Sequence, residues 1–164
     1  YLIIDLPPGT GDIQMALSRL LPQAELIVVT TPQLMAQKVA TRVADMAKRS
    51  FIPLLGVIEN MSYFESDTGD KYNIFGEGGG EALSDKFGIP LLGKVPISEN
   101  TNNVADSGTP LIDQNNSVTK IEIEKLINNI AIQLPPIIDE TCTGRLAKVF
   151  EELSNQWTLF LLMN

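Results

Sequence analysis

YLIIDLPPGTGD, from Tyr1 to Asp12, is the most informative segment of the chain. Its apolar run ends at one acid, Asp5, and a turn rich in proline and glycine leads to a second acid, Asp12. An apolar run without polar alternation is typical of a parallel strand that is covered on both faces. Open α/β sheets bind their ligands at the carboxyl ends of such strands. We therefore predict an α/β fold in which Asp5 lies at the ligand-binding edge of the sheet.

The turn that follows Asp5 contains the residue types that a phosphate-sensing loop needs. Gly9 and Gly11 allow the backbone to approach a phosphate closely or to rearrange after the phosphate is lost. A carboxylate at position 5 can hold Mg²⁺, directly or through a water molecule, beside the phosphates of a substrate. From these residues alone, an ordinary strand end followed by a tight turn remains the alternative.

The rest of the chain alternates between strand and helix patterns. Helical patterns cover residues 13–21, a segment that opens at Thr31 and Pro32, residues 81–87 and residues 119–134, and buried-strand patterns cover residues 25–30, 54–58 and 91–95. This alternation predicts a parallel sheet flanked by helices. In the second helix, Met35, Val39, Val43 and Met46 recur at helical spacing, and we interpret this stripe as core packing. The last helix should bury one face that carries Ile123, Ile127, Ile130 and Leu134.

The end of the chain has a different pattern. Apolar residues recur every three or four positions over residues 145–162, which predicts an amphipathic helix. Its basic residues, Arg145 and Lys148, are offset by Glu151 and Glu152, so core packing or a dimer contact is favoured over membrane binding. We divide the chain into a first part, residues 1–134, and a C-terminal helical extension, residues 135–164.

Composition narrows the classes of partner and compartment. The net charge is −8 and the isoelectric point is near 4.5, which argues against a broad nucleic-acid surface. The single cysteine, Cys142, excludes an internal disulfide and fits a reducing cytoplasm. We expect Cys142 to have a structural or incidental role. Neither a membrane span nor a signal peptide is predicted.

Several segments resemble the Mrp-type iron–sulfur cluster carrier ATPases, relatives of MinD and ParA among the deviant P-loop NTPases. Besides residues 1–12 they are GVIENMSYF (56–64), IFGEGGGEAL (74–83), FGIPLLGKVPIS (87–98) and DSGTPLI (106–112). The resemblance covers residues 1–134. It implies a P-loop NTPase-like fold, with ATP hydrolysis and iron–sulfur cluster carriage or assembly in the full-length protein.

The resemblance also implies roles for particular residues. Asp5, Gly9, Gly11 and Asp12 would form the catalytic segment, with Asp5 ordering Mg²⁺ through a water molecule. Asn60 would read adenine, and Val95, Pro96 and Ile97 would border the base. The carboxamide of Asn60 suits this role because it can pair with the amino group and N7 of adenine. A simple turn-forming role for Asn60 is the alternative.

Two family features are missing. No GxxxxGK[ST] string, the Walker A segment, occurs, and residues 76–80 are rich in glycine but lack its lysine and a preceding apolar strand. We therefore expect this chain to be the C-terminal part of a longer ATPase, inactive in isolation. The CxxC pair of the family is replaced by ESDTGDK (65–71), which predicts a solvated hairpin turn and argues against cluster binding there.

Three functions remain open. The first is a homodimeric, Mg²⁺-dependent ATPase that carries iron–sulfur clusters to apo-proteins. The second is a positioning ATPase of the MinD or ParA type that holds no cluster. The third is a non-catalytic binding fragment.

Overall fold

The computed structural model describes residues 1–7, 11–66, 68–98, 108, 117–135 and 159–163. Within this part of the chain, six strands form one sheet in the order β1-β6-β2-β3-β4, and β5 pairs with β3. The strands are β1 (Leu2–Leu6), β2 (Glu25–Thr30), β3 (Leu54–Glu65), β4 (Lys71–Tyr72), β5 (Leu91–Ile97) and β6 (Leu159–Met163). All described pairings are parallel except that of β4 with β3.

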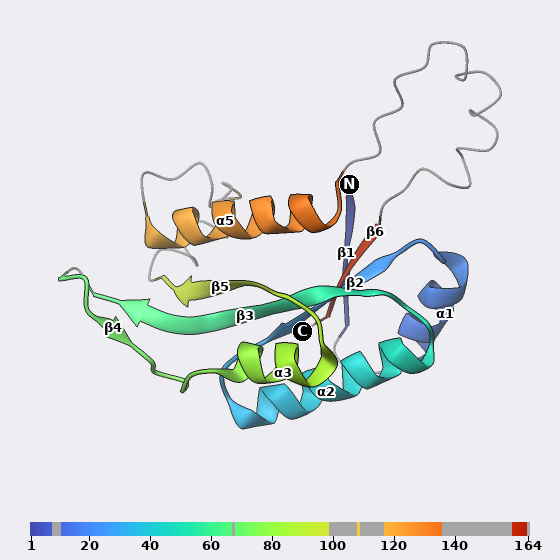
Figure 1. The fold of residues 1–164 in the computed structure, drawn as a ribbon, viewed down its shortest axis with the longest axis horizontal. Helices are drawn as coiled ribbons and strands as arrows, with labels where there is room; N and C mark the ends of the chain where they lie inside the picture. Colours follow the sequence, from blue (N-terminus) through green and yellow to red (C-terminus); the bar gives the residue numbers. More distant parts are fainter. Residues whose placement is uncertain (8–10, 67, 99–107, 109–116, 136–158, 164) are drawn as a thin grey trace, which may run out of the picture.

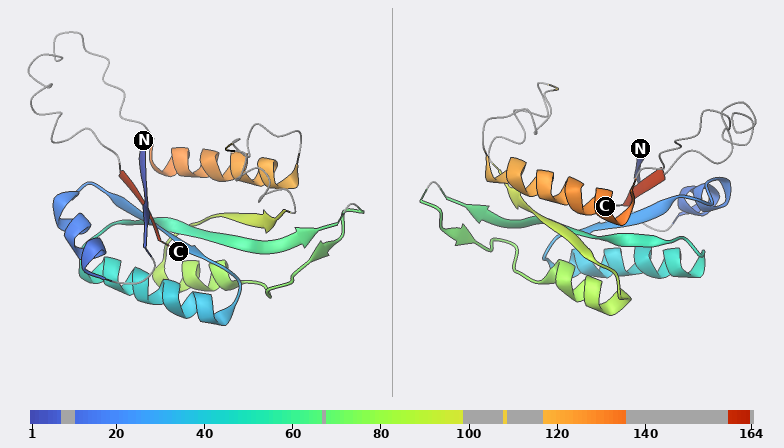
Figure 2. Two further views of the ribbon diagram at one scale, coloured as in Figure 1. Left: turned by 180° about the vertical axis from the view of Figure 1, so that it is seen from behind. Right: turned by 45° about the horizontal axis from the view of Figure 1, so that its top comes forward.

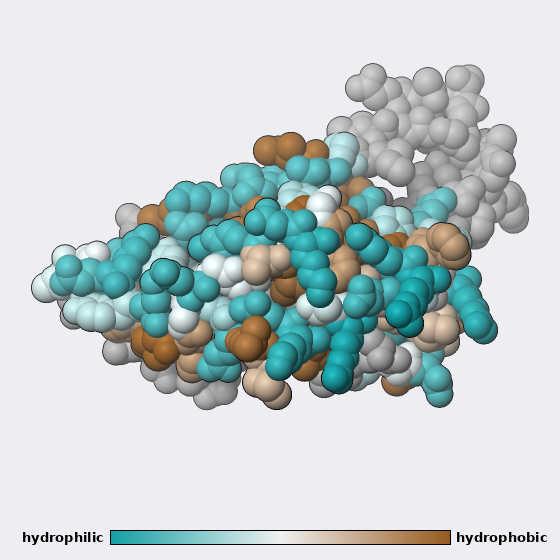
Figure 3. Space-filling view, turned by 60° about the horizontal axis from the view of Figure 1, so that its bottom comes forward, coloured by the Kyte–Doolittle hydropathy of each residue, from teal (hydrophilic) through white to brown (hydrophobic). Residues whose placement is uncertain are grey.

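Helices lie on both sides of this sheet. They are α1 (Asp12–Leu20), α2 (Leu34–Arg49), α3 (Gly79–Phe87) and α5 (Val118–Gln133). Figure 1 and Figure 2 show α5 on one face of the sheet, and α2 and α3 side by side on the other. The surface turned outward on the α2 and α3 side is mostly hydrophilic, with scattered apolar residues (Figure 3). The predicted α/β class, a parallel sheet flanked by helices, is confirmed.

Two apolar clusters fill the layers between the sheet and its helices. Leu26 and Val28 of β2 belong to the cluster that contains the buried residues of α2, whereas Ile27 belongs to the cluster under α5. Alternate side chains of β2 therefore point to opposite faces, and both faces are covered. Each fully buried Leu, Ile or Val stabilises the fold by about 1.5–3 kcal/mol relative to an exposed one.

The boundaries of most elements agree with the sequence patterns. The strand over residues 25–30 is confirmed, and α1, α3, β5 and α5 differ from their predicted ranges by one or two residues. The exception is β3, which continues from Ile58 through Glu65 and then forms a hairpin with β4. The hairpin predicted at residues 65–71 is therefore confirmed.

Three apolar patterns are less buried than the sequence predicts. In α2, Val43 and Met46 are buried, but Met35 is 71% exposed and Val39 is also exposed, because the helix packs against the sheet only from Ala40 onward. In α5, Leu126 joins the core in place of the exposed Ile127. The expectation that β1 is covered on both faces is wrong, since β1 is at the edge of the sheet that the described strands form and Ile3 is 62% exposed.

The prediction of an amphipathic helix over residues 145–162 is wrong for the last four of these residues. Leu159–Met163 is instead a strand that lies between β1 and β2 and pairs with both. Five consecutive apolar residues fit a central parallel strand as well as a helix, and the pairing partners decide between the two. Residues 145–158, and Cys142 before them, lie outside the described residues. Among the helices that the structure describes, none is long and apolar enough to cross a membrane.

Candidate functional site at the carboxyl edge of the sheet

The carboxyl ends of β1, β2, β3 and β5 meet at one edge of the sheet because these strands run parallel. Polar residues gather there: Asp5 on β1, Thr30 on β2, Glu59 and Asn60 on β3, and Lys94 on β5. The predicted site residues within the described part of the chain lie at this edge or in the turn that leaves it. Such an edge is the usual ligand site of open α/β sheets.

Asp5 is the fourth residue of β1, and its side chain is exposed. The turn after β1 is tied to α1 by Gln14, whose side chain is 3% exposed and whose Nε2 donates to the carbonyl of Pro7 at 2.8 Å. Gly11 is the N-cap of α1, and Asp12 is its first residue. Gly9 lies outside the described residues. The sequence analysis missed Gln14, and the signal for it was a polar residue within an amphipathic helix just after the turn.

The residues at this end of the sheet fit a magnesium ion only if phosphates complete its ligand shell. Asp5 offers one exposed carboxylate, and no group of three or more His, Cys, Asp or Glu side chains gathers as a metal site among the described residues. Mg²⁺ commonly takes one or two protein carboxylates beside substrate phosphates and water. The donor set therefore suits a metal–nucleotide complex rather than a metal site made wholly of protein.

Asn60 and Val95, both predicted to border adenine, are register partners on adjacent strands. Beyond them the register shifts, because Phe64 pairs with Ile97, so β3 has two extra residues and forms a bulge. Met61 follows Asn60 with φ at +53°, in the left-handed region that non-glycine residues seldom adopt. The side-chain oxygen of Asn60 accepts the backbone N–H of Met61 at 2.9 Å. Bulges and such backbone conformations are over-represented beside functional sites.

The two halves of the predicted site are not in contact. Asp5 is level with Ile27 on β2 and Gly56 on β3, so Asn60 lies four residues farther along β3. Asn60 is thus three strands away from Asp5 across the sheet and four residues farther along the strand direction. On a flat sheet these two displacements place the backbones of Asp5 and Asn60 ~20 Å apart. A ligand that touches both must be elongated and lie along the edge.

The glycine run before α3 serves packing. A Cβ on Gly79 would lie 2.8 Å from the Cα of Pro32, and a Cβ on Gly80 would lie 2.8 Å from the Cβ of Glu59. Gly78, the N-cap of α3, has φ at +78°. These glycines bring the start of α3 against the residues that follow β2 and against the middle of β3.

Lys94 is the basic residue of this polar group. Its Nζ hydrogen-bonds to the carboxylate of Glu81 and lies 3.8 Å from Oε1 of Glu59. The hydrogen bond to Glu81 and the charges of nearby glutamates raise the pKa of Lys94 although burial opposes this shift. Burial raises the pKa of Glu81, but hydrogen bonds and the charge of Lys94 outweigh it and leave that pKa below its usual value.

The hairpin at residues 65–71, where the family has its CxxC pair, offers only oxygen atoms as metal ligands. Glu65 forms an ion pair with Lys71 at 3.8 Å, and Thr68 donates to the carboxylate of Asp70 at 2.7 Å. The backbone N–H of Ser66 donates to the carbonyl of Asp70 at 3.0 Å. Iron–sulfur clusters need thiolate ligands, so the described residues of this hairpin do not fit a cluster.

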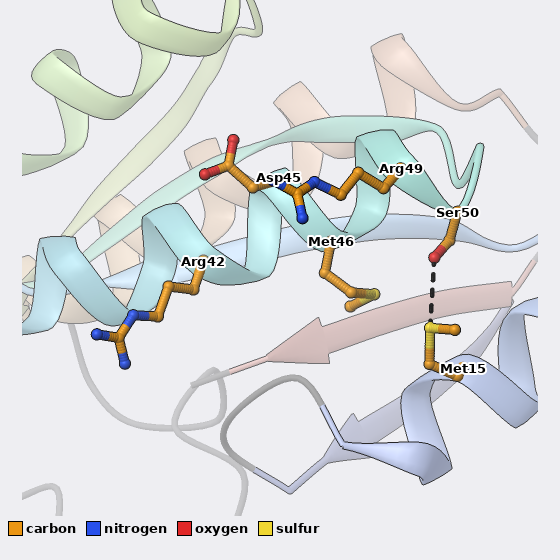
Figure 4. Close-up of a pocket in the computed structure, with 6 residues that line it drawn as sticks. All are labelled: Met15, Arg42, Asp45, Met46, Arg49 and Ser50. Carbon is orange, nitrogen blue, oxygen red and sulfur yellow. Dashed lines mark hydrogen bonds between the residues drawn. The ribbon is translucent and has the colours of Figure 1, made fainter.

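A cavity of about 480 Å³ lies elsewhere, between α1 and the second half of α2. Figure 4 shows Met15, Met46 and Ser50 close together, with Ser50 hydrogen-bonded to the sulfur of Met15, whereas Arg42 extends away from them. None of the predicted site residues lines this cavity.

Comparisons with known proteins agree with this geometry. A ParA family model, described as NUBPL iron-transfer P-loop NTPase, matches residues 1–133. A protein of Deinococcus radiodurans named iron-sulfur cluster carrier protein is 47% identical over 113 residues, which are 68% of this chain and 32% of that protein. A protein of the same name from Pseudomonas fragi is 39% identical over 79% of this chain and 46% of its own length. The chain thus spans about a third to a half of these relatives.

Solved structures add a similarity of fold. A nucleotide-binding protein from Archaeoglobus fulgidus, solved in complex with ADP, is 34% identical, with a TM-score of 0.53 over 63% of this chain and 43% of that one. The cell division ATPase MinD of Pyrococcus furiosus is 23% identical, with a TM-score of 0.51 over 66% of this chain and 42% of that one. The second likeness concerns the fold alone.

Proposed function

Because the chain belongs to the ParA family of NUBPL-type iron-transfer P-loop NTPases, we propose that it is part of a protein that binds and hydrolyses ATP. The observation that carries the proposal is the common edge of the parallel sheet at which Asp5, Asn60 and Val95 all lie. The ADP complex of the Archaeoglobus relative supports an adenine nucleotide as the ligand.

Different residues along this edge contact different parts of the nucleotide. Asn60 and the backbone of residues 95–97 hold the adenine, and Asp5 faces the phosphates. The segment from Gly9 to Asp12 responds to the γ-phosphate, and Gln14 on α1 holds the carbonyl of Pro7 where the chain leaves β1. The relatives extend beyond the part that this chain matches, and we assign the phosphate-binding loop with its lysine to that further part of a full-length protein.

Asp5 would hold Mg²⁺ through a water molecule. When bound, the metal neutralises charge that develops on the phosphates. The remaining contribution of the chain is positioning, because phosphoryl transfer depends mainly on alignment and electrostatic stabilisation. Asp5 is exposed and lies at the end of a strand, so it can reach a ligand without disturbing the core.

In the full-length protein we assign this ATPase to iron–sulfur cluster carriage, as a homodimer that delivers clusters to apo-proteins. The names of the relatives support this cargo. A second function, a positioning ATPase without a cluster, is favoured by the hairpin at residues 65–71, whose described residues offer only oxygen ligands.

Two measurements on the full-length protein test the proposal. Isothermal calorimetry with Mg-ATP should detect binding, and a phosphate-release assay should detect hydrolysis; absence of both would refute the ATPase. Anaerobic reconstitution with iron and sulfide then separates the two functions. Cluster absorbance followed by transfer to an apo-protein supports the carrier, and its absence in an active ATPase supports the cluster-free alternative.

A further inference from the structure

Glu59 is a buried carboxylate in the middle of β3, opposite Thr30 at the end of β2, and the roles proposed above do not use it. Its side chain is only 1% exposed, and it lies between Ile58, a core residue, and Asn60. Glutamate is almost never fully buried unless its charge is paired. The sequence signal for it was an acid that directly follows the apolar run at residues 54–58.

Both carboxylate oxygens of Glu59 have partners from different elements. The backbone N–H of Gly80, in the first turn of α3, donates to Oε2 at 2.5 Å. The hydroxyl of Ser62 donates to Oε1, and Nζ of Lys94 lies 3.8 Å from the same oxygen. Glu59 therefore connects β3 to α3 and to β5.

The start of α3 is shaped to receive this carboxylate. Gly80 lies so close to Glu59 that a Cβ at position 80 would be 2.8 Å from the Cβ of Glu59 and 2.9 Å from a methyl group of Leu91. The N-terminus of a helix favours a negative charge because its first N–H groups lack partners within the helix. The buried charge and the helix end stabilise each other.

The hydrogen bond between Ser62 and Glu59 spans the start of the bulge in β3, where the strand is kinked at Asn60 and Met61. Asn60 and Met61 lie between these two residues, and Met61 has the left-handed backbone. Non-glycine residues seldom adopt that region because it is sterically strained, so the surrounding structure must hold Met61 there. On the neighbouring strand, Lys94 pairs with Glu59 and Val95 pairs with Asn60. The contacts of Glu59 thus hold the backbone on each side of Asn60.

We propose that Glu59 is a positioning residue for base recognition: its buried carboxylate fixes the Asn60–Met61 kink against β5 and α3 and so aims the Asn60 amide at the purine. This inference rests on the proposed nucleotide function. Glu59 itself does not touch the base, because its carboxylate is enclosed by Ser62, Gly80 and Lys94. A carboxylate that only joined elements together would affect stability and leave base selectivity unchanged.

The test compares ATP and GTP affinities of the full-length protein and its variants by fluorescence titration, with tripolyphosphate as a probe of phosphate binding. Glu59→Gln preserves the side-chain size but gives one partner an amide N–H₂ in place of an acceptor oxygen. We expect its ATP-to-GTP preference to fall by about fivefold, the equivalent of one net hydrogen bond, while tripolyphosphate affinity is unchanged. Glu65→Gln, the same substitution on the same strand, is the matched control and should keep the preference.

Ser62→Ala removes only the hydrogen bond across the kink and should shift the preference in the same direction. If circular dichroism shows that Glu59→Gln does not fold, the nucleotide preference of Ser62→Ala tests the inference by itself. A preference within about twofold of wild type in a folded Glu59→Gln and in Ser62→Ala would overturn the inference alone. Failure of the unmodified protein to bind ATP would instead refute the proposed function, and the inference with it.

Discussion

Asn60 and Val95 stand opposite each other on the parallel strands β3 and β5, at the point where the bulge in β3 begins. The sequence places these residues 35 positions apart, and strand pairing makes them neighbours at the predicted ligand-binding edge. Because the side chain of Asn60 also accepts the N–H of Met61, its orientation is coupled to the kinked backbone. The predicted adenine site therefore depends on the local geometry of β3.

Replacing Asn60 by alanine should weaken ATP binding about tenfold in the full-length protein, because one or two hydrogen bonds to the base are lost. Fluorescence titration with ATP measures the effect. Asn73→Ala serves as the control, since the side chain of Asn73 donates to Glu77 within its own loop. Equal affinities of the Asn60 variant and the wild type would remove Asn60 from the site.

Asp5→Ala should abolish ATP turnover of the full-length protein while the fold stays intact. The side chain of Asp5 is exposed, so its removal should change the free energy of unfolding by no more than about 0.5 kcal/mol. Phosphate release and thermal unfolding together check both parts. Asp45→Ala, at another exposed aspartate, should leave turnover unchanged. A normal kcat in Asp5→Ala would contradict the assigned role.

Gly80→Ala should destabilise the fold by about 1–3 kcal/mol, because the added methyl group has no space beside Glu59 and Leu91. Urea unfolding measures the loss. In Gly93→Ala the new Cβ would lie 3.2 Å from the end of the Leu126 side chain, which can move, so a smaller loss is expected. The opposite ranking would mean that α3 can shift away from β3 at little cost.

The Glu81–Lys94 pair should make stability depend on pH in a defined window. The pKa of Glu81 is lowered on folding, so its contribution is present above the ordinary value of 4.5 and is lost as pH falls through the lowered pKa. The pKa of Lys94 is raised, so its contribution is present below 10.5 and is lost as pH rises through the raised pKa.

Glu81→Gln should therefore lower Tm at neutral pH and converge with the wild type in strong acid. The loss should be at most about 1 kcal/mol, because the side chain of Glu81 is 45% exposed and water screens the pair. Thermal melts from pH 3 to pH 9 measure it, with Glu124→Gln on the outside of α5 as the control. A difference that persisted unchanged into strong acid would show that Glu81 acts through packing rather than charge.

Leu161→Pro should destabilise the sheet by about 3 kcal/mol or more, because position 161 lies in a strand with a neighbour on each side and proline cannot donate to either. Leu161→Val keeps the N–H and is the control. Thermal unfolding compares the two. Equal stabilities would mean that β6 contributes little to joining β1 and β2.

Residue patterns were sufficient for much of the fold. Continuous apolar runs such as ELIVVT at residues 25–30 require burial on both faces, and helical spacing marks α1 and α5, so the class of sheet follows from local chemistry. Family motifs also indicated Asp5, near the end of β1, and Asn60, which lies in the middle of β3 just beyond the level at which β2 ends. Apolar spacing failed at Met35 and Val39 because it reports which residues share a helix face and not how far that face extends over the sheet.

What the sequence determined by itself was the kind of most elements and the edge at which polar residues collect, because both follow from residue preferences over short stretches. Only the tertiary structure decided that Leu159–Met163 is a strand between β1 and β2, that β3 bulges after Asn60, and that Glu59 is enclosed by Ser62, Gly80 and Lys94. The physical reason is that strand pairing and charge burial depend on interactions between groups that are distant along the chain. These interactions form only when folding has brought the groups together.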